Sequence, residues 1–218
     1  MNLSFQRLGL LLLTLLWLTS PVLATDKPGR PAKKSTKDEL VTITTPQGVV
    51  RLILFDDTPL HKANFLTKAK SGFYNGTTFH RVIPGFMIQG GDANSKDADP
   101  GNDGLGQPTE GTVPAELAAG HQHNYGALAA ARQGDFANPE RASSIAQFYV
   151  VENREGTHFL DGQYTVFGQV IQGLDVIGKI AALPRDGRDR PSADVKMTIK
   201  VEKLKRKKIA QSYGYTYQ

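Results

Sequence analysis

A short segment of the chain combines a cation, a side-chain amide and apolar side chains at close spacing. It reads F-H-R-V-I-P-G-F-M-I-Q-G-G-D from Phe79 to Asp92. Two strands broken by the Pro-Gly pair would let period-two alternation gather several of these side chains around one concave surface. The candidates are Arg81, Phe86, Met87 and Gln89. Spacing alone also permits a surface arginine beside a core hairpin, because isolated charged residues usually serve solubility.

Other kinds of catalytic site find little support. The chain has no cysteine, which excludes disulfides, thiol nucleophiles and Cys-ligated zinc. His121 and His123 form an H-x-H pair, but no carboxylate pattern accompanies it, so we expect solvated histidines and no metal. The acidic run from Asp92 to Asp103 lacks the glycine and glutamate positions of a calcium loop. Ser143-Ser144 has no G-x-S-x-G elbow around it, which argues against a hydrolase. We expect no cofactor.

Eight short segments with strand character, separated by turn residues, must position this candidate site. Alternation is clearest at Val41 to Thr44 and at Val195 to Glu202. Eight strands predict a mainly β protein with a closed antiparallel barrel, since closure removes exposed sheet edges. The other six segments are Val49 to Phe55, Thr77 to Ile83, Phe86 to Gln89, Gly126 to Ala131, Ile145 to Val151 and Thr165 to Val170.

Two α-helices are predicted to cap the barrel. The first has Thr58 at a cap position, Pro59 at the first helical position and Gly72 at its end. The second runs from about Leu174 to Ala182, with apolar residues at helical spacing.

The segment from Phe79 to Asp92 resembles the signature of the cyclophilin family almost residue for residue. Two further segments match in the expected order, Q-F-Y-V-V from Gln147 to Val151 and F-L-D-G-Q-Y-T-V-F-G-Q-V from Phe159 to Val170. With Gly126-Ala127-Leu128, the resemblance covers about residues 40–202. It implies an eight-stranded antiparallel barrel with two helices and a substrate groove on the outer wall.

The resemblance also implies a role for eleven residues in binding and rotating Xaa-Pro bonds. Arg81 would be the catalytic arginine, with Gln89 and Gln147 as polar neighbours, and the backbone of Ala131 and Arg132 would hold the substrate as an extended strand. The apolar residues would form the proline pocket and its rim: Phe86, Met87, Tyr149, Phe159, Leu160 and Tyr164.

These residue types suit peptidyl-prolyl isomerisation. Rotation about a peptide bond meets a barrier of about 18–20 kcal/mol, which arises from partial C–N double-bond character. An apolar socket can hold the proline ring while a fixed arginine donates to the prolyl nitrogen, whose lone pair becomes available only in the twisted state. The planar guanidinium can also hold the substrate carbonyl.

Four departures from the best-known eukaryotic cyclophilins resemble the bacterial, secreted branch. Phe159 stands where a tryptophan is familiar, Tyr164 where a histidine is, and Arg132 where an asparagine is. The loop from Gln133 to Ala146 is longer. The resemblance therefore implies an isomerase whose cyclosporin affinity and substrate preference differ from those of the eukaryotic members.

The N-terminus predicts export across the inner membrane to the periplasm. Arg7 and an apolar run to Leu18 are followed by Val22-Leu23-Ala24, so residues 1–24 read as a signal peptide cleaved after Ala24. An uncleaved anchor is the alternative, although the run is shorter than the roughly 20 apolar residues of a membrane span. Residues 25–39 lack large apolar side chains and predict a flexible basic linker.

The positive charge of the chain lies at its ends. Residues 40–201 hold 15 basic and 17 acidic residues, whereas residues 203–218 hold five basic residues, no acidic one and three tyrosines. A nucleic-acid-binding domain is therefore disfavoured. The C-terminal segment predicts a solvated tail or a weak contact with an anionic surface.

We expect a monomer that acts on proline-containing polypeptides. Two alternatives from other classes remain at this point: a proline-binding or chaperone module of the cell envelope that does not catalyse, and a structural envelope protein whose basic tail is the functional part.

Overall fold

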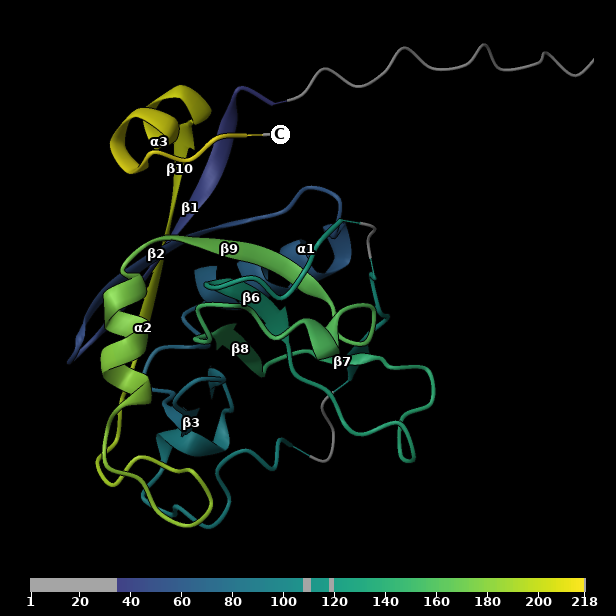
Figure 1. Cartoon of the computed structure of the whole chain (residues 1–218), viewed down its shortest axis with the longest axis vertical. Helices are drawn as coiled ribbons and strands as arrows, with labels where there is room; N and C mark the ends of the chain where they lie inside the picture. Colours follow the sequence, from purple (N-terminus) through teal and green to yellow (C-terminus); the bar gives the residue numbers. More distant parts are fainter. Residues whose placement is uncertain (1–34, 108–110, 118–119, 218) are drawn as a thin grey trace, which may run out of the picture. The chain divides into compact units, whose positions relative to one another are not determined.

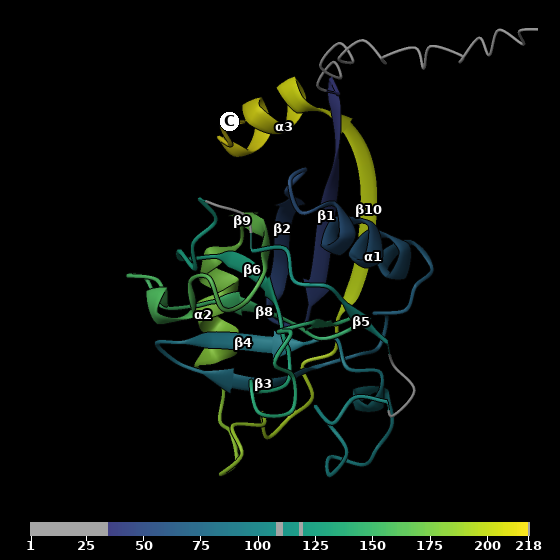
Figure 2. The same cartoon turned by 90° about the vertical axis from the view of Figure 1, so that its right-hand side faces the viewer.

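Eight antiparallel strands form one strongly curled sheet in the computed structural model, which describes residues 35–107, 111–117 and 120–217. Figure 2 shows β1 and β10 running crosswise to β3 and β4 at the other end of the sheet. Each predicted strand is present. In sheet order they are β10 (Thr198–Lys205), β1 (Lys37–Thr45), β2 (Gly48–Leu54), β9 (Val166–Gln172), β6 (Ala127–Ala130), β8 (Phe148–Val151), β4 (Met87–Gly90) and β3 (Phe79–Ile83).

The prediction of a closed barrel is wrong, because the sheet is a curled half-barrel whose edge strands β3 and β10 do not pair as a ladder. A single isolated bridge, Thr78 to Lys196, joins the segments that precede them. Farther along β3, the Val82 N–H donates to the Asp189 carbonyl at 2.8 Å. A loop thus occupies the edge that a closing strand would need.

Alternation along the strands produces two different faces. The inner face carries the main core, in which Val41, Leu52, Leu128 and Val150 are fully buried. The outer face carries a second apolar cluster on β4, β6 and β8, with Met87, Tyr149 and Val151 among its members. Because successive side chains point to opposite faces, the same strands build the core and the wall of a surface site.

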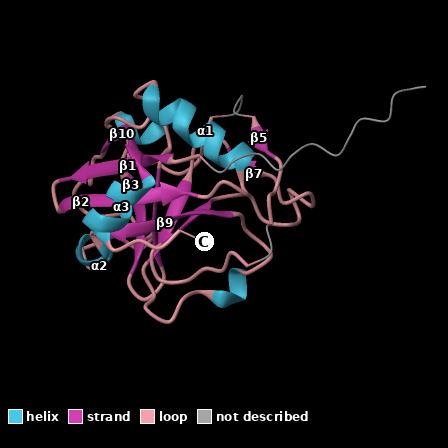
Figure 3. Ribbon diagram, turned by 90° about the horizontal axis from the view of Figure 1, so that it is seen from above, coloured by secondary structure: helices cyan, strands magenta, loops and turns pink. Residues whose placement is uncertain are grey.

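Two helices form at the predicted positions in the sequence and pack against the inner face of the curled sheet. Helix α1 (Pro59–Lys70) contributes Phe65, Leu66 and Ala69 to the main core, and α2 (Leu174–Ala181) contributes four residues. Figure 3 shows α1 at the top and α2 at the lower left of the strands, so the two helices lie apart. Thr58 makes no side-chain cap. The Glu116 carboxylate instead accepts from the N–H groups of Leu60 and His61, both at 2.9 Å, and so caps α1 from a distant loop.

The basic C-terminal segment is folded, which differs from the predicted solvated tail. Strand β10 continues to Lys205, and a third helix, α3 (Arg206–Tyr213), follows it (Figure 1). Ile209 is fully buried with Leu40 and Ile53, and Tyr213, Tyr215 and Tyr217 pack against this cluster. The apolar residues of this C-terminal segment contact β1 and β2. A count of charged residues does not predict those contacts. Lys207 and Lys208 are exposed, so contact with an anionic surface stays a prediction.

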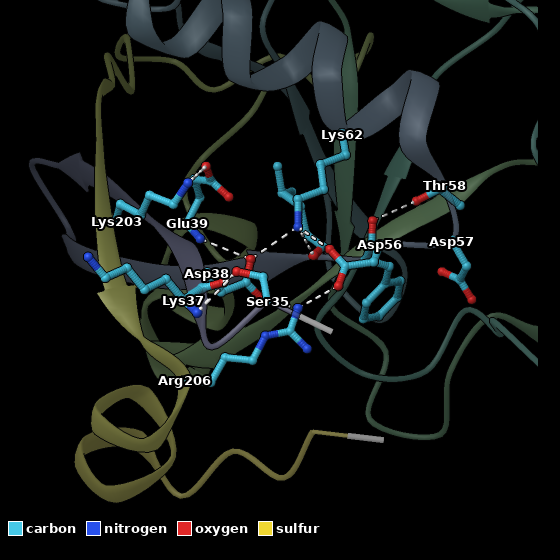
Figure 4. A network of polar contacts seen from close by, with 12 residues as sticks. Ser35, Lys37, Asp38, Glu39, Asp56, Asp57, Thr58, Lys62, Lys203 and Arg206 are labelled. Atoms are coloured by element: carbon cyan, nitrogen blue, oxygen red, sulfur yellow. Dashed lines mark hydrogen bonds and ion pairs between the residues drawn. The ribbon is translucent and has the colours of Figure 1, made fainter. Parts of the chain in front are cut away.

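A network of four charged side chains joins this segment to the sheet (Figure 4). Lys62 bridges Asp38 at 3.0 Å and Asp56 at 2.7 Å. Arg206 contacts the same two carboxylates and lies 4.6 Å from the Tyr217 ring centroid. Burial alone would lower the pKa of Lys62, but its hydrogen bonds to Asp56 and Asp38 raise it overall. Asp38 belongs to β1, which begins at Lys37, so residues 37–39 form part of the sheet where a linker was predicted.

Short elements complete the described structure. They are β5 (Thr112–Val113) paired with β7 (Ser143–Ser144), and the 3-10 turns η1 (Asn94–Lys96) and η2 (His158–Leu160). None of the helices formed by the described residues has the length and apolarity needed to cross a membrane. The predicted signal peptide and most of the predicted linker lie outside the described residues.

Candidate functional site

A row of side chains crosses the outer face of the sheet on four neighbouring strands. Arg81 of β3 is paired with Gln89 of β4, Gln89 with Tyr149 of β8, and Tyr149 with Ala129 of β6. Directly paired residues project to the same face. The row therefore places a guanidinium, an amide and an aromatic ring side by side on the outer face, with Ala129 next to the aromatic ring.

A pocket of about 130 Å³ lies over this row. Drug-sized ligands occupy pockets of about 300–1,000 Å³, so this one suits a single ring-sized side chain. The structure brings nine of the eleven predicted site residues together around it: Arg81, Phe86, Met87, Gln89, Ala131, Arg132, Tyr149, Leu160 and Tyr164.

The two remaining predicted residues lie next to the pocket. Gln147 accepts a hydrogen bond from the Gln89 amide nitrogen at 2.9 Å and donates to the Gly104 carbonyl at 3.1 Å. This chain of amides fixes the orientation of Gln89 and connects the pocket to a neighbouring hollow of about 360 Å³, which Gln147 lines. Phe159 stacks on Phe86 at a ring-centroid distance of 5.8 Å and is 67% exposed, so it forms the rim.

Arg81 is only weakly restrained by other protein groups. Its side chain is 43% exposed, and its one ion pair within the described ranges is with Asp189, whose Oδ2 lies 4.0 Å from Nε. Asp189 has a positive φ of 63° and also accepts from Arg185 at 3.1 Å. Guanidinium groups carry five N–H donors, so most of the donors of Arg81 remain available to a ligand.

Aromatic side chains form the apolar wall. The rings of Tyr149 and Tyr164 meet edge to face at 6.0 Å and 81°. Arg132 lies 4.3 Å from the Tyr164 ring centroid, and its Nε donates to the Gln163 carbonyl at 2.9 Å. This arginine side chain is 2% exposed, so it supports the wall from behind. Burial raises the pKa of the Tyr149 hydroxyl, which therefore stays neutral.

A cation beside an apolar socket on the outer face of a curled sheet is the arrangement that the sequence predicted. A model of the family described as cyclophilin type peptidyl-prolyl cis-trans isomerase/CLD matches residues 40–201. The chain belongs to the cyclophilin family. A peptidyl-prolyl cis-trans isomerase of Acinetobacter baylyi is 38% identical over 153 residues, which are 66% of this chain and 73% of that protein.

Eukaryotic cyclophilins are also similar. The peptidyl-prolyl cis-trans isomerase-like 2 of Rhizopus delemar is 36% identical over 171 residues, 76% of this chain, although the match spans only 29% of that longer protein. A crystal structure of a Cryptosporidium parvum cyclophilin type peptidyl-prolyl cis-trans isomerase, obtained in the presence of the dipeptide Ala-Pro, matches with a TM-score of 0.62 and 26% identity. The match covers 75% of this chain and 98% of the Cryptosporidium parvum chain.

One predicted contact of this cyclophilin needs correction. The Ala131 N–H donates to the Gln147 carbonyl at 3.0 Å, and the Ala131 carbonyl accepts from the Ser144 N–H at 2.8 Å. The Ala131 N–H is therefore not free to bind an extended substrate, because it already donates to Gln147 in the segment before β8. Within the described residues Arg132 makes no backbone hydrogen bond, so its backbone remains the available one.

Sequence reasoning missed several groups around the cyclophilin pocket. Asp189 pairs with Arg81 from far along the chain, and the Gly104 carbonyl orients Gln147. The prediction that His123 is solvated is wrong, because its side chain is fully buried behind Tyr149. No group of three metal-ligating residues occurs in the part of the chain that the structure describes. The H-x-H spacing pointed to His123 but not to its partners, which come from other elements.

Proposed function

We propose that this chain catalyses cis/trans isomerisation of Xaa-Pro bonds in exported polypeptides and that Arg81 stabilises the twisted amide. The observation that carries the proposal is the pocket in which Arg81 and Gln89 flank a socket built from Phe86, Met87 and Tyr149. The presence of the dipeptide Ala-Pro with a similar cyclophilin supports proline as the bound residue.

The chemistry requires no bond to break. The planar amide is stabilised by resonance, and its nitrogen lone pair is delocalised. As the C–N bond twists, the lone pair localises on the nitrogen and becomes a hydrogen-bond acceptor. A guanidinium donor held beside the socket binds that acceptor better in the twisted state than in either planar state. Differential binding of this kind lowers the barrier.

Two-dimensional exchange spectroscopy on an Xaa-Pro peptide tests the proposal. Catalytic amounts of purified protein should produce cis/trans exchange cross-peaks that are absent from the peptide alone, because uncatalysed exchange takes tens of seconds or longer. A non-catalytic proline-binding module would shift peptide resonances without accelerating exchange. Binding without exchange would therefore refute the isomerase and favour the chaperone alternative.

The isomerisation rate constant is expected to stay nearly flat from about pH 6 to 9. Arginine remains charged and tyrosine neutral over most of this range. Burial lowers the pKa of both buried histidines beside pocket residues: His123, which contacts Tyr149, and His80, which directly precedes Arg81. Neighbouring carboxylates, Asp161 for His123 and Asp92 for His80, oppose this shift without reversing it. Rates measured across this range by the exchange experiment provide the check, and a bell-shaped profile would indicate a titrating acid or base instead.

We propose further that the mature protein begins after Ala24 and is periplasmic. The proposal rests on the order of Arg7, the apolar run and Val22-Leu23-Ala24. Intact-mass measurement of the exported protein should show loss of residues 1–24. A membrane-bound species that retains Met1 would contradict cleavage and favour an anchor.

A further inference from the structure

A buried histidine connects two walls of the proline pocket. His123 is fully buried, and its Nε2 lies 2.8 Å from the Tyr149 hydroxyl oxygen. Its Nδ1 lies 2.8 Å from Oδ1 of Asp161, the residue directly after Leu160. Tyr149 belongs to β8 and Leu160 to η2, and both line the pocket. One imidazole thus contacts both elements.

Hydrogen-bonding rules assign the tautomer. Burial alone would raise the pKa of Asp161, but hydrogen bonds from His123 and His158 lower it overall, so the carboxylate is ionised and can only accept. The His123 Nδ1 must therefore carry the hydrogen that it donates. A neutral imidazole then has an acceptor at Nε2, and the Tyr149 hydroxyl donates to it.

The backbone reinforces this arrangement. The His123 N–H donates to Asp161 Oδ1 at 2.8 Å, and the His123 carbonyl accepts from the Thr157 N–H at 2.8 Å. The segment that precedes β6 is thereby joined at three points to the turn around η2. His123 cannot shift without moving that turn, which makes it a rigid support.

The contact fixes the hydroxyl end of the Tyr149 side chain and so the direction of its long axis. Rotation of the ring about that axis leaves the hydroxyl oxygen in place, so neighbouring rings must hold the ring plane. The imidazole and phenol planes are almost parallel, at 12°, with ring centroids 6.0 Å apart. The Tyr164 ring then packs edge-on against both, at 6.5 Å from His123 and 6.0 Å from Tyr149. The hydrogen bond and these ring contacts together hold Tyr149 in the wall of the pocket.

We propose that His123, held by Asp161 as the Nδ1–H tautomer, is a positioning residue that fixes the Tyr149 ring in the pocket for the substrate proline. This inference rests on the proposed isomerase function. His123 does not touch the substrate, and it acts by keeping the wall in the orientation that the proline ring contacts.

Two substitutions separate the contacts of His123. The amide nitrogen of asparagine is three bonds from Cα, as is Nδ1 of histidine. His123→Asn therefore keeps a donor to Asp161 and loses the hydrogen bond with the Tyr149 hydroxyl. The amide of glutamine reaches the position of Nε2, so His123→Gln keeps a polar partner for the Tyr149 hydroxyl. Tyr149→Phe removes the hydroxyl alone and keeps the ring.

We expect His123→Asn and Tyr149→Phe each to lower kcat/KM roughly three- to tenfold, the factor that corresponds to one ordinary hydrogen bond. The double variant should be no worse than either single variant, because both changes remove the same interaction. His123→Gln, the matched control, should retain most of the activity. If the double variant loses the product of the two single effects, or if His123→Gln loses as much as His123→Asn, the inference is wrong.

Two further measurements keep the test independent of folding and of turnover. In the wild type, imidazole ¹⁵N spectra should show a protonated Nδ1 and an unprotonated Nε2 for His123, and Tyr149→Phe should shift the Nε2 signal. A protonated Nε2 would overturn the assignment. Titration with the dipeptide Ala-Pro should show weaker binding to His123→Asn by the same factor. A wild type that binds the dipeptide without accelerating exchange would refute the proposed function alone, whereas unchanged dipeptide binding by His123→Asn would refute the positioning role.

Discussion

Replacing Arg81 with alanine is expected to lower the catalysed isomerisation rate about 10²–10³-fold while leaving the protein folded. The estimate takes the loss of one preorganised donor to a developing negative or lone-pair centre as its guide. The Arg81 side chain is 43% exposed and makes a single long ion pair with Asp189, so its removal should change stability little. Exchange spectroscopy measures the rate, and circular dichroism verifies the fold.

Two variants sharpen this test. Arg81→Lys should rescue little, because an ammonium group lacks the planar fork of donors. Arg185→Ala is the matched control, since Arg185 also pairs with Asp189, at 3.1 Å, but does not line the pocket. It should keep nearly full activity. The assignment of Arg81 fails if folded Arg81→Ala retains more than about half of the wild-type rate.

Replacing Ile209 with alanine is expected to lower the free energy of unfolding by about 2–4 kcal/mol, the usual loss when a buried isoleucine becomes alanine. Ile209 is fully buried between α3 and the sheet, where it contacts a cluster that includes Leu40 and Ile53. For a domain of this size the melting temperature should fall by roughly 5–15 °C. The pocket belongs to a different apolar cluster, so activity at low temperature should survive.

Urea denaturation and limited proteolysis distinguish global from local loss. If α3 unfolds with the domain, the urea midpoint falls, and if α3 undocks by itself, the C-terminal segment is cleaved first. The exposed neighbour Lys208 provides the control, because Lys208→Ala should change stability by less than about 0.5 kcal/mol. An Ile209→Ala variant with an unchanged midpoint and unchanged protease resistance would show that the helix is not docked.

The amino-acid sequence by itself determined the eight strands and the first two helices. These follow from local signals, such as the alternation of Val41 and Ile43 with threonines, or Pro59 followed by helical spacing. The same sequence, through its resemblance to one family, also identified the residues that now surround a single pocket. The motif contains both the site residues and the strands that hold them. The paired strands β3 and β4 bring Arg81 and Gln89 to the same face.

Only the tertiary structure decided how the ends of the sheet and chain are covered. At the open edge of the sheet the Val82 N–H of β3 donates to the Asp189 carbonyl, and no local pattern distinguishes the loop around Asp189 from a solvated turn. The basic C-terminal segment folds because Ile209 finds Leu40 and Ile53 on strands more than 150 positions away in the sequence. The charges of this segment predicted a solvated tail, but the buried apolar contacts of Ile209 fold it against the sheet.

The support of the pocket was equally invisible to sequence reasoning. Glu116 caps α1 across 55 positions, and His123 reaches Tyr149 across 26 positions and Asp161 across 38. A lone histidine or glutamate has the same local signature whether it is solvated or buried. Periodicity reports which way a strand or helix faces, because that depends on neighbours in the chain. The partner of a polar group depends on which distant segments the fold brings within hydrogen-bonding distance, and only tertiary packing determines that.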